Sequence, residues 1–285
     1  ADELSLYGRF DFILAKDGTP KILEFNADTP TSLLEASVIQ WQWKEDVFPE
    51  CDQFNGIHEG LVQSWKDIFP KKGEIYFAGA LENNEDTGTL QYLASTAMEA
   101  GFSTRVLDMQ ALDLQNGRFF DPAGELVNRC FKLYPWEWMV DESPDGCLAE
   151  MEWLEPIWKL VMSNKAILAT LYELFPDSPY VLPCYLSRPR SGLFCKKPIF
   201  SREGHNVSVV DIRDWEEYVR IAETEGDYNT GAYVYQEYVE PTVYSGRYPV
   251  IGSWIIGGEA AGIGIRENRM EVTDNLSEFV PHIIG

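Results

Sequence analysis

The sequence predicts an α+β fold. Strand-like and helix-like segments alternate over residues 74–134, as they do in small α/β units. A hairpin pattern precedes this region, and strand-like segments return beyond residue 181. The length of 285 residues corresponds to one large domain or two ordinary ones, since a domain averages roughly 150 residues. We therefore expect helices and strands along the whole chain and a sheet-rich C-terminal third.

The first part of the chain is expected to form a hairpin followed by helices. Residues 7–14 and 21–26 read as two strands around an Asp-Gly pair, which is a common hairpin turn. Residues 30–46 are rich in Leu, Ala, Gln and Trp and favour a helix. Residues 55–69 carry apolar side chains at helical spacing, which predicts an amphipathic helix.

The middle of the chain reads as an α/β unit that ends in a polar stretch. Residues 74–81 predict a buried strand, and residues 87–100 predict a helix. Two further strands are expected over 103–108 and 126–133. The Pro- and Gly-containing stretch 141–148 is a candidate domain boundary.

The last part of the chain is expected to begin with helices and to continue as a sheet. Residues 151–175 predict helix, in one piece or two. Strands follow beyond residue 181, with one acidic helix near 214–225. No run approaches the roughly 20 apolar residues that a membrane-spanning helix requires, so we expect no membrane partner.

The charge balance separates classes of partner. Lys and Arg number 23 and Asp and Glu number 46, which gives a net charge of −23. A chain this acidic does not favour wrapping by a nucleic-acid backbone, although a local basic cleft can still hold nucleotide phosphates. An acidic field favours cationic partners such as amines and metal ions. The alternative is that the charge serves solubility alone.

The cysteine and histidine counts point to a reducing compartment. The five cysteines are widely spaced without a C-x-x-C pair, and there are three histidines. We therefore expect free thiols in a cytoplasmic protein rather than disulfides or a zinc site. The opening ADELSLYGRF does not resemble a signal peptide and leads almost directly into a strand pattern, so we expect an N-terminal part to be missing.

The hairpin at the start of the chain carries the first candidate site. Side chains alternate between the two faces of a strand, so Arg9 and Asp11 share a face, as do Glu24 and Asn26. If the apolar faces of the two strands coincide, these four side chains project together. Carboxylate and amide oxygens suit Mg²⁺, and a nearby Arg can stabilise phosphoryl charge. The alternative is a solvated polar face. The Thr- and Ser-rich run Ala-Asp-Thr-Pro-Thr-Ser (27–32) is a candidate substrate loop.

A second candidate site combines two lysines with a small loop. The segment KKPIFSREGHNVS (196–208) places a lysine pair before a loop whose backbone N–H groups can hold phosphates. It is not a P-loop, because G-x-x-x-x-G-K-[ST] is absent. Lys165 stands near a predicted helix start, where an anion-binding lysine is reasonable. An ordinary basic turn is the alternative for the loop.

Two strand-like segments complete the candidates. YVYQEYVE (233–240) can offer backbone groups to an adenine edge, although any strand end can do the same. GIGIRENR (262–269) places Arg266 in a Gly-rich strand, either as a phosphate or carboxylate clamp or as a surface side chain.

Taken together, these segments resemble the glutathionylspermidine synthase family. The resemblance covers essentially the whole chain and is closest to stand-alone bacterial members described as acid–amine ligases, which lack the amidase domain. It rests on RFDF (9–12), EFNADTPTS (24–32), LLEA (33–36), FKLYPWEWM (131–139), EPIWKLVMSNKA (155–166), KKPIFSREG (196–204), YQEYV (235–239) and GIGIRE (262–267).

The resemblance implies an ATP-grasp fold in permuted order with an associated pre-ATP-grasp α/β domain. Residues 1–50 would supply a metal-binding hairpin and helix to the ATP-grasp core. Residues 51–140 would form the pre-ATP-grasp-like domain, and residues 141–285 the nucleotide-binding lobes. Family members of the stand-alone type extend further at the N-terminus.

The resemblance also implies a role for each candidate residue. The implied Mg²⁺ ligands are Asp11, Glu24 and Asn26. The implied ATP-binding residues are Lys165, Lys197, Ser201, Arg202, Gly204, Gln236, Glu237, Tyr238 and Val239. The implied catalytic residues are Arg9 and Arg266. The implied substrate residues are Thr31 and Ser32 near the acid, with Glu85 and Asp86 holding the amine.

The implied activity is an ATP- and Mg²⁺-dependent carboxylate–amine ligase that forms an amide bond through an acyl phosphate. The acid would be a glutathione-like peptide and the amine a polyamine, although Leu133 stands where the synthases carry a hydroxyl residue, which leaves both substrates open. One alternative is an ATP hydrolase or a nucleotide-gated binding protein without ligase activity. Another, based on the net charge, is a polyamine-binding domain without enzymatic function.

Overall fold

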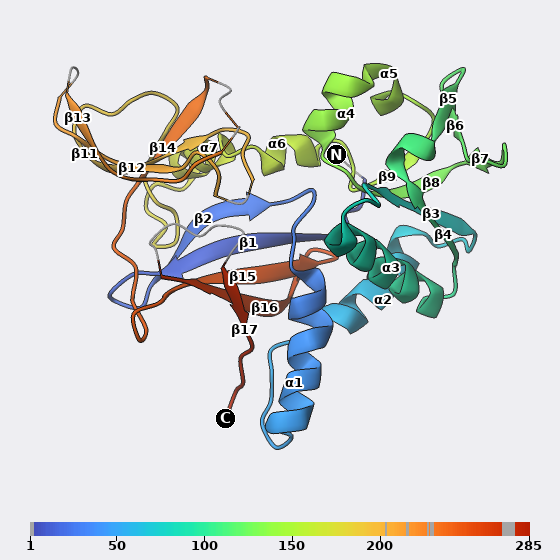
Figure 1. Ribbon diagram of the computed structural model, residues 1–285, viewed down its shortest axis with the longest axis horizontal. Coiled ribbons are helices and arrows are strands. Elements are labelled where there is room, and N and C mark those ends of the chain that lie inside the picture. Colours follow the sequence, from blue (N-terminus) through green and yellow to red (C-terminus); the bar gives the residue numbers. More distant parts are fainter. Residues whose placement is uncertain (1–2, 203, 215–216, 227, 229–230, 270–276) are drawn as a thin grey trace.

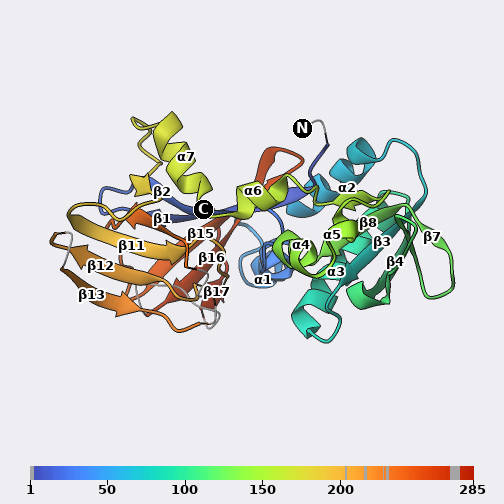
Figure 2. The ribbon, with the colours of Figure 1, turned by 90° about the horizontal axis from the view of Figure 1, so that it is seen from above.

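Three larger sheets and one small sheet organise the chain in the computed structural model (Figure 1). The structure describes residues 3–202, 204–214, 217–226, 228, 231–269 and 277–285. Figure 2 shows two of the larger sheets at opposite ends of the molecule, with the first hairpin and α6 (Lys159–Ser163) running between them. The predicted α+β class is confirmed.

The central sheet joins the two ends of the chain. Its antiparallel strands have the order β17-β16-β15-β1-β2. Their bounds are β1 (Tyr7–Leu14), β2 (Pro20–Asn26), β15 (Tyr248–Ile256), β16 (Glu259–Asn268) and β17 (Glu278–Val280). The predicted first hairpin is therefore confirmed, and β1 pairs on its other side with β15 from the C-terminal part of the chain.

A second antiparallel sheet, called here the outer sheet, has the order β10-β14-β11-β12-β13. Its strands are β10 (Cys184–Tyr185), β11 (Gly192–Pro198), β12 (Ser208–Ile212), β13 (Tyr218–Glu223) and β14 (Tyr233–Glu237). The acidic helix predicted near 214–225 is wrong where the structure describes this region. Tyr218, Val219 and Ile221 favour strands, and pairing of β13 with β12 overrides the helical pattern.

The third sheet, called here the parallel sheet, has the order β4-β3-β8-β9. Its strands are β3 (Glu74–Gly79), β4 (Ser103–Asp108), β8 (Arg129–Leu133) and β9 (Glu152–Leu154). The predicted strand–helix–strand unit is confirmed, because α3 (Asn84–Glu99) connects the parallel strands β3 and β4. β9 follows the polar stretch 141–148 and pairs with β8, so the sheet continues beyond that stretch.

The remaining elements are short. The small antiparallel sheet contains β5 (Asp113–Gln115), β6 (Arg118–Phe120) and β7 (Leu126–Val127). The further helices are η1 (Glu35–Ile39), α1 (Gln40–Val47), α2 (Ile57–Ile68), η2 (Met109–Ala111), α4 (Trp136–Glu142), α5 (Pro144–Cys147) and α7 (Ile167–Leu174). The helical prediction over 151–175 is confirmed as two pieces, α6 and α7, but its first residues form β9.

The main hydrophobic core lies between the parallel sheet, α2, α3 and the central sheet. Trp65 of α2 is fully buried, and its ring packs edge-on against Phe77 of β3 and Phe131 of β8. Its indole N–H donates to Thr96 Oγ1 of α3 at 2.9 Å. Trp254 of β15 belongs to the same core. This core fixes the parallel sheet to the central sheet, and so fixes the side chains at their junction.

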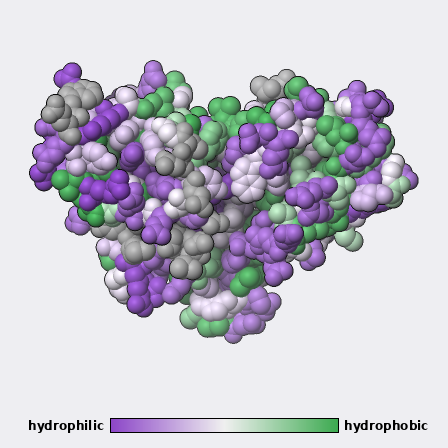
Figure 3. Space-filling model, turned by 45° about the horizontal axis from the view of Figure 1, so that its top comes forward, coloured by the Kyte–Doolittle hydropathy of each residue, from purple (hydrophilic) through white to green (hydrophobic). Residues whose placement is uncertain are grey.

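Polar and charged side chains are frequent on the surface. Figure 3 shows many hydrophilic residues on one face, with hydrophobic patches between them. Among the residues that the structure describes, no helix is both long enough and apolar enough to span a bilayer.

The buried indole of Trp65 provides a test of this core. Replacement of a large aromatic side chain by Ala costs about 3–5 kcal/mol, because apolar contacts are lost and a cavity remains. We expect Trp65→Ala to lower the free energy of unfolding by about that amount, measured by urea denaturation. Met98→Ala, on an exposed turn of α3, is the control and should change it by less than about 0.5 kcal/mol. Equal small effects in both variants would contradict the described core.

Candidate functional site

The polar face of the first hairpin converges on one buried carboxylate. In the register of β1 and β2, Arg9 lies opposite Asn26 and Asp11 lies opposite Glu24, so the prediction that these side chains share a face is confirmed. Asp11 accepts hydrogen bonds from Arg9 Nε at 2.6 Å and from a terminal nitrogen of Arg266 at 2.8 Å. A single carboxylate is therefore held between two guanidinium groups.

Burial and neighbouring charges shift the pKa values of the two arginines in opposite directions. Burial disfavours the charge of Arg9, but Asp11, Glu24 and Tyr7 together outweigh it and raise the pKa of Arg9. Burial and the like charge of Arg9 lower the pKa of Arg266, against the attraction of Asp11. Because one carboxylate does not neutralise two guanidinium groups, the pair retains positive charge for an anionic ligand.

A bulge in β2 lies beside Glu24. The register of β1 and β2 shifts between Asp11 and Phe12, which leaves Leu23 as the extra residue. Bulges bend a strand and redirect its side chains. Asn26 Nδ2 reaches both Asp11 Oδ2 and Glu24 Oε1 at 3.3 Å. The carboxylates of Asp11 and Glu24, on neighbouring strands, thus both contact the Asn26 amide.

Two buried lysines approach the hairpin from other elements. Lys165 lies between α6 and α7, and its Nζ is 3.1 Å from Glu24 Oε2 and 2.7 Å from the Ser201 carbonyl oxygen. Lys197 of β11 donates to Gln236 Oε1 at 2.7 Å and to a backbone carbonyl of β2 at 3.1 Å. The bond from Lys197 to β2 joins strands of different sheets, so no local sequence pattern predicts it.

The lysines determine the ionisation of Glu24. Burial alone would raise the pKa of Glu24, but Lys165 and Lys197 lower it to about 2. The carboxylate is therefore ionised at neutral pH. The charged side chains gathered here are Arg9, Arg266, Lys165 and Lys197 against Asp11 and Glu24. Four cations against two anions make this part of an acidic protein locally positive, which suits a polyanion.

Two cavities meet at this charged cluster. The smaller, of about 100 Å³, lies between the central and outer sheets. Its lining includes Asp11, Glu24, Lys165, Lys197, Gly204, Gln236, Glu237, Tyr238 and Val239. The larger, of about 240 Å³, extends from the hairpin toward the parallel sheet. Its lining includes Arg9, Glu24, Asn26, Thr29, Thr31, Glu85, Asp86, Tyr134, Trp138, Arg202, Gly204 and Arg266.

The segment at the end of β14 lines the smaller cavity. The N–H groups of Glu237 and Tyr238 donate to the carbonyl oxygens of Pro183 and Leu193 at 2.7 and 2.9 Å. These bonds hold the segment that was predicted as an adenine edge against its neighbours. Val239 lines the cavity beyond them.

The predicted loop 201–206 divides between the two cavities. Glu203 lies outside the described residues. Arg202, expected with the nucleotide group, lines the larger cavity and not the smaller one. Its guanidinium donates to Thr29 Oγ1 at 2.5 Å and to Glu137 Oε1 at 2.7 Å. Gly204 lines both cavities.

The predicted substrate residues fall at different distances from the cluster. Thr31 lines the larger cavity, and its carbonyl oxygen accepts a hydrogen bond from Arg9. Ser32 begins the following helical segment, where its carbonyl oxygen accepts from Ala36 N, and it lines neither cavity. Glu85 and Asp86 lie in the first turn of α3, at the wall of the larger cavity.

The sequence patterns did not single out Tyr134, Glu137 or Trp138, and they included Thr29 only as part of the Thr- and Ser-rich run 27–32. Tyr134 and Trp138 supply aromatic surface, and Glu137 and Thr29 hold Arg202. All four lie within segments that carried the family resemblance, ADTPTS after β2 and YPWEWM after β8. The available signal was therefore their clustering immediately after two strands, where binding side chains are common.

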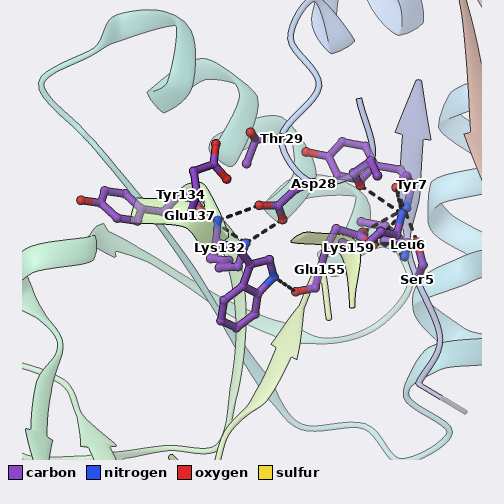
Figure 4. A network of polar contacts seen from close by, with 12 residues as sticks. Ser5, Leu6, Tyr7, Asp28, Thr29, Lys132, Tyr134, Glu137, Glu155 and Lys159 are labelled. Atoms are coloured by element: carbon purple, nitrogen blue, oxygen red, sulfur yellow. Dashed lines mark hydrogen bonds and ion pairs between the residues drawn. The ribbon is translucent and has the colours of Figure 1, made fainter. Parts of the chain in front are cut away.

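A buried polar network holds these two segments together (Figure 4). Asp28 and Lys132 form an ion pair at 2.7 Å, with side chains 1% and 0% exposed. Asp28 also accepts from Trp136 N at 2.9 Å, and Lys132 donates to the Tyr134 carbonyl oxygen at 2.9 Å. The loop after β2 is thereby fixed to the end of β8 and the start of α4.

The same network continues through a second buried ion pair. Lys159 of α6 lies 3.3 Å from Glu155, and it donates to the carbonyl oxygens of Tyr7 and Ala27 at 2.8 and 3.0 Å. Glu155 accepts from Leu6 N at 3.0 Å and from Tyr7 N at 3.1 Å (Figure 4). Burial raises the pKa of Glu155 despite Lys159. The start of β1 is therefore tied to α6.

Among the described residues, no group of three or more His, Cys, Asp or Glu side chains has an arrangement that holds a metal ion. The hairpin offers two carboxylates and one amide instead. This donor set is compatible with Mg²⁺, which commonly takes one or two protein carboxylates and completes its shell with water and substrate phosphates.

Comparison with known proteins assigns a family. The family model "Glutathionylspermidine synthase preATP-grasp" matches residues 1–285. A Haemophilus influenzae protein named "Putative acid–amine ligase" is 39% identical, covering 97% of this chain and 74% of that protein. The trypanothione synthetase of Crithidia fasciculata is 28% identical, covering 95% of this chain and 46% of its own length. The chain thus spans only about half of that longer relative.

A solved structure shares the fold. The structure titled "Putative gamma-glutamylcysteine synthetase" from Methylobacillus flagellatus superimposes with a TM-score of 0.66 at 10% identity. The match covers 98% of this chain and 80% of that chain. At this identity the similarity establishes the architecture alone.

The low pKa of Glu24 predicts a pH dependence. Because its pKa is lower in the folded state than the ordinary value of 4.5, its contribution to stability is present above about pH 4.5 and is lost as the pH falls toward 2. We expect NMR titration of the Glu24 carboxyl carbon to give a pKa of about 2, rising toward 4.5 in Lys165→Met. A titration midpoint near 4.5 in both proteins would contradict the close approach of Lys165.

The buried pair of Asp28 and Lys132 predicts strong coupling. Removal of one partner leaves a buried charge without its counterion, which costs about 3–5 kcal/mol. We expect Asp28→Asn and Lys132→Met each to lower the free energy of unfolding by about that amount, and the double variant to lose much less than the sum. The measurement is urea denaturation.

The exposed pair of Arg118 and Glu150 is the matched control for this cycle. Their side chains are 54% and 74% exposed, so the coupling between them should be below about 1 kcal/mol. Additive effects at Asp28 and Lys132 would show that the pair does not act as a unit.

Proposed function

Because the chain belongs to the glutathionylspermidine synthase family, we propose that it is an ATP- and Mg²⁺-dependent ligase that joins a carboxylic acid to an amine. The observation that carries the proposal is the convergence of four cations and two carboxylates where the two cavities meet. In this assignment the hairpin with the metal ligands precedes the ATP lysines in sequence, which corresponds to a permuted ATP-grasp order.

The smaller cavity is the proposed nucleotide site. Lys165 and Lys197 would bind phosphates as point charges, and the backbone of 237–239 would face the base. The carboxylates of Asp11 and Glu24 each lie 3.3 Å from the Asn26 amide nitrogen, so the three side chains are close enough to share one divalent cation. The proposed metal ligands are Asp11, Glu24 and Asn26. When bound, Mg²⁺ would neutralise phosphate charge during transfer.

The larger cavity is the proposed site for the acid and the amine. The acid would lie near Arg9 and Thr31, with its carboxylate directed at the γ-phosphate. The amine would approach along the wall that carries Glu85 and Asp86, whose charges favour a cation. The family name and the names of its relatives support a glutathione-like peptide as the acid and a polyamine as the amine.

The chemistry follows from this arrangement. The carboxylate oxygen attacks the γ-phosphorus, the bond to ADP breaks, and an acyl phosphate forms. Arg9 and Arg266 stabilise the charge that spreads over the transferring oxygens. The amine nitrogen then attacks the acyl carbon, phosphate leaves, and the amine loses a proton. The protein mainly positions the reactants and excludes water, which would otherwise hydrolyse the acyl phosphate.

The proposal is tested by phosphate release from ATP with Mg²⁺, across a panel of peptide acids with and without spermidine. We expect release that requires both an acid and an amine, together with a product that carries a new amide bond. Release that is indifferent to both would instead indicate an ATP hydrolase.

Three variants test the site assignment within the same assay. Asp11→Asn, Glu24→Gln and Lys197→Met should each lower turnover by about 10²-fold or more, because each removes a charge that acts on the transferred phosphoryl group. Lys16→Met, at an exposed ion pair with Glu240, is the control and should retain turnover. Near-normal turnover in all three would refute the assignment.

A further inference from the structure

Gln236 lies where the outer sheet meets the edge of the central sheet. Its side chain belongs to β14 and is 2% exposed. The amide oxygen accepts a hydrogen bond from Lys197 Nζ at 2.7 Å, and the amide nitrogen donates to the Ile22 carbonyl oxygen at 2.8 Å. Each end of the amide therefore has a partner inside the protein, and the two partners lie on different sheets.

The partner strand explains why these bonds matter. β2 is an edge strand, and the backbone groups on its open side need partners. Ile22 N donates to the Tyr180 carbonyl oxygen at 2.9 Å, and the Ile22 oxygen accepts from Gln236. Lys197 donates to the carbonyl oxygen of the bulged Leu23 at 3.1 Å. Gln236 and Lys197 are thus anchored together immediately before Glu24.

The number of N–H donors on Lys197 indicates where its ammonium group is directed. An ammonium group has three N–H donors. Among the described residues its acceptors are Gln236 and Leu23, which leaves the third donor for a ligand in the smaller cavity that Lys197 lines. Because Gln236 is neutral, it orients the lysine without cancelling its charge. A carboxylate at position 236 would orient the lysine but would also cancel its charge.

We propose that Gln236 is a positioning residue that directs Lys197 at the phosphates of the nucleotide, rather than a residue that recognises adenine. The inference rests on the proposed nucleotide site. It separates Gln236 from Glu237, Tyr238 and Val239, with which the family resemblance grouped it. The amide would act through Lys197, so its removal should resemble removal of the lysine itself.

Two partial ligands distinguish the two roles. Tripolyphosphate carries the phosphates without a base, and adenosine carries the base without phosphates. Their affinities for the full chain are measured by ligand-observed NMR in the presence of Mg²⁺. We expect Gln236→Leu to weaken the affinity for tripolyphosphate by about tenfold or more, as for loss of a charge-assisted hydrogen bond. The affinity for adenosine should change by less than about twofold.

The lysine variant completes a cycle. Lys197→Met should weaken the affinity for tripolyphosphate to a similar degree. The double variant with Gln236→Leu should lose little more affinity, because both changes remove the same contact. Tyr235→Phe is the matched control. Tyr235 neighbours Gln236 on β14 but points to the opposite face of the sheet, so both affinities should be retained.

A second variant guards against an unfolded protein. Gln236→Glu has nearly the same shape, but it places a carboxylate on Lys197 and removes the donor to Ile22. Gln236→Glu should also weaken the affinity for tripolyphosphate. Its thermal unfolding transition should show that the variant remains folded. Unchanged tripolyphosphate affinity in a folded variant, or a loss of adenosine affinity alone, would overturn the inference. A wild-type protein that binds neither probe would overturn the proposed nucleotide site, and the inference with it.

Discussion

The buried ion pair between Asp28 and Lys132 is the constraint on which the rest of the site depends. Burial lowers the pKa of Lys132, and the charge and hydrogen bond of Asp28 oppose that effect. Both carboxylate oxygens of Asp28 are used, one on Lys132 and one on the backbone of Trp136. The loop after β2 therefore has a single position relative to the parallel sheet, and the wall of the larger cavity follows from it.

Side chains of the outer sheet hold the edge strand β2 in a similar way. One side of this strand pairs with β1, and its open side receives hydrogen bonds from the side chains of Gln236 and Lys197. The strand that carries Glu24 and Asn26 is thus held by both the central and the outer sheets. Backbone groups that would otherwise be exposed are used to bring Lys197 close to Glu24.

Local charge differs from global charge in this protein. The net charge of −23 suggests cationic partners, and the wall with Glu85 and Asp86 agrees with that. The point where the cavities meet is positive, however, because four cations surround two carboxylates. A locally positive centre can persist inside an acidic protein, because exposed charges more than a Debye length away are largely screened by salt.

Local sequence patterns were enough to predict the hairpin, the strand–helix–strand unit and the shared polar face of Arg9, Asp11, Glu24 and Asn26, because alternation along a strand is a local property. The tertiary structure makes β13 a strand, since its pairing with β12 outweighs a helical pattern. It also decided the partners of Lys197, Arg202 and Asp28. These contacts join residues that are 39 or more positions apart, and no local pattern encodes them.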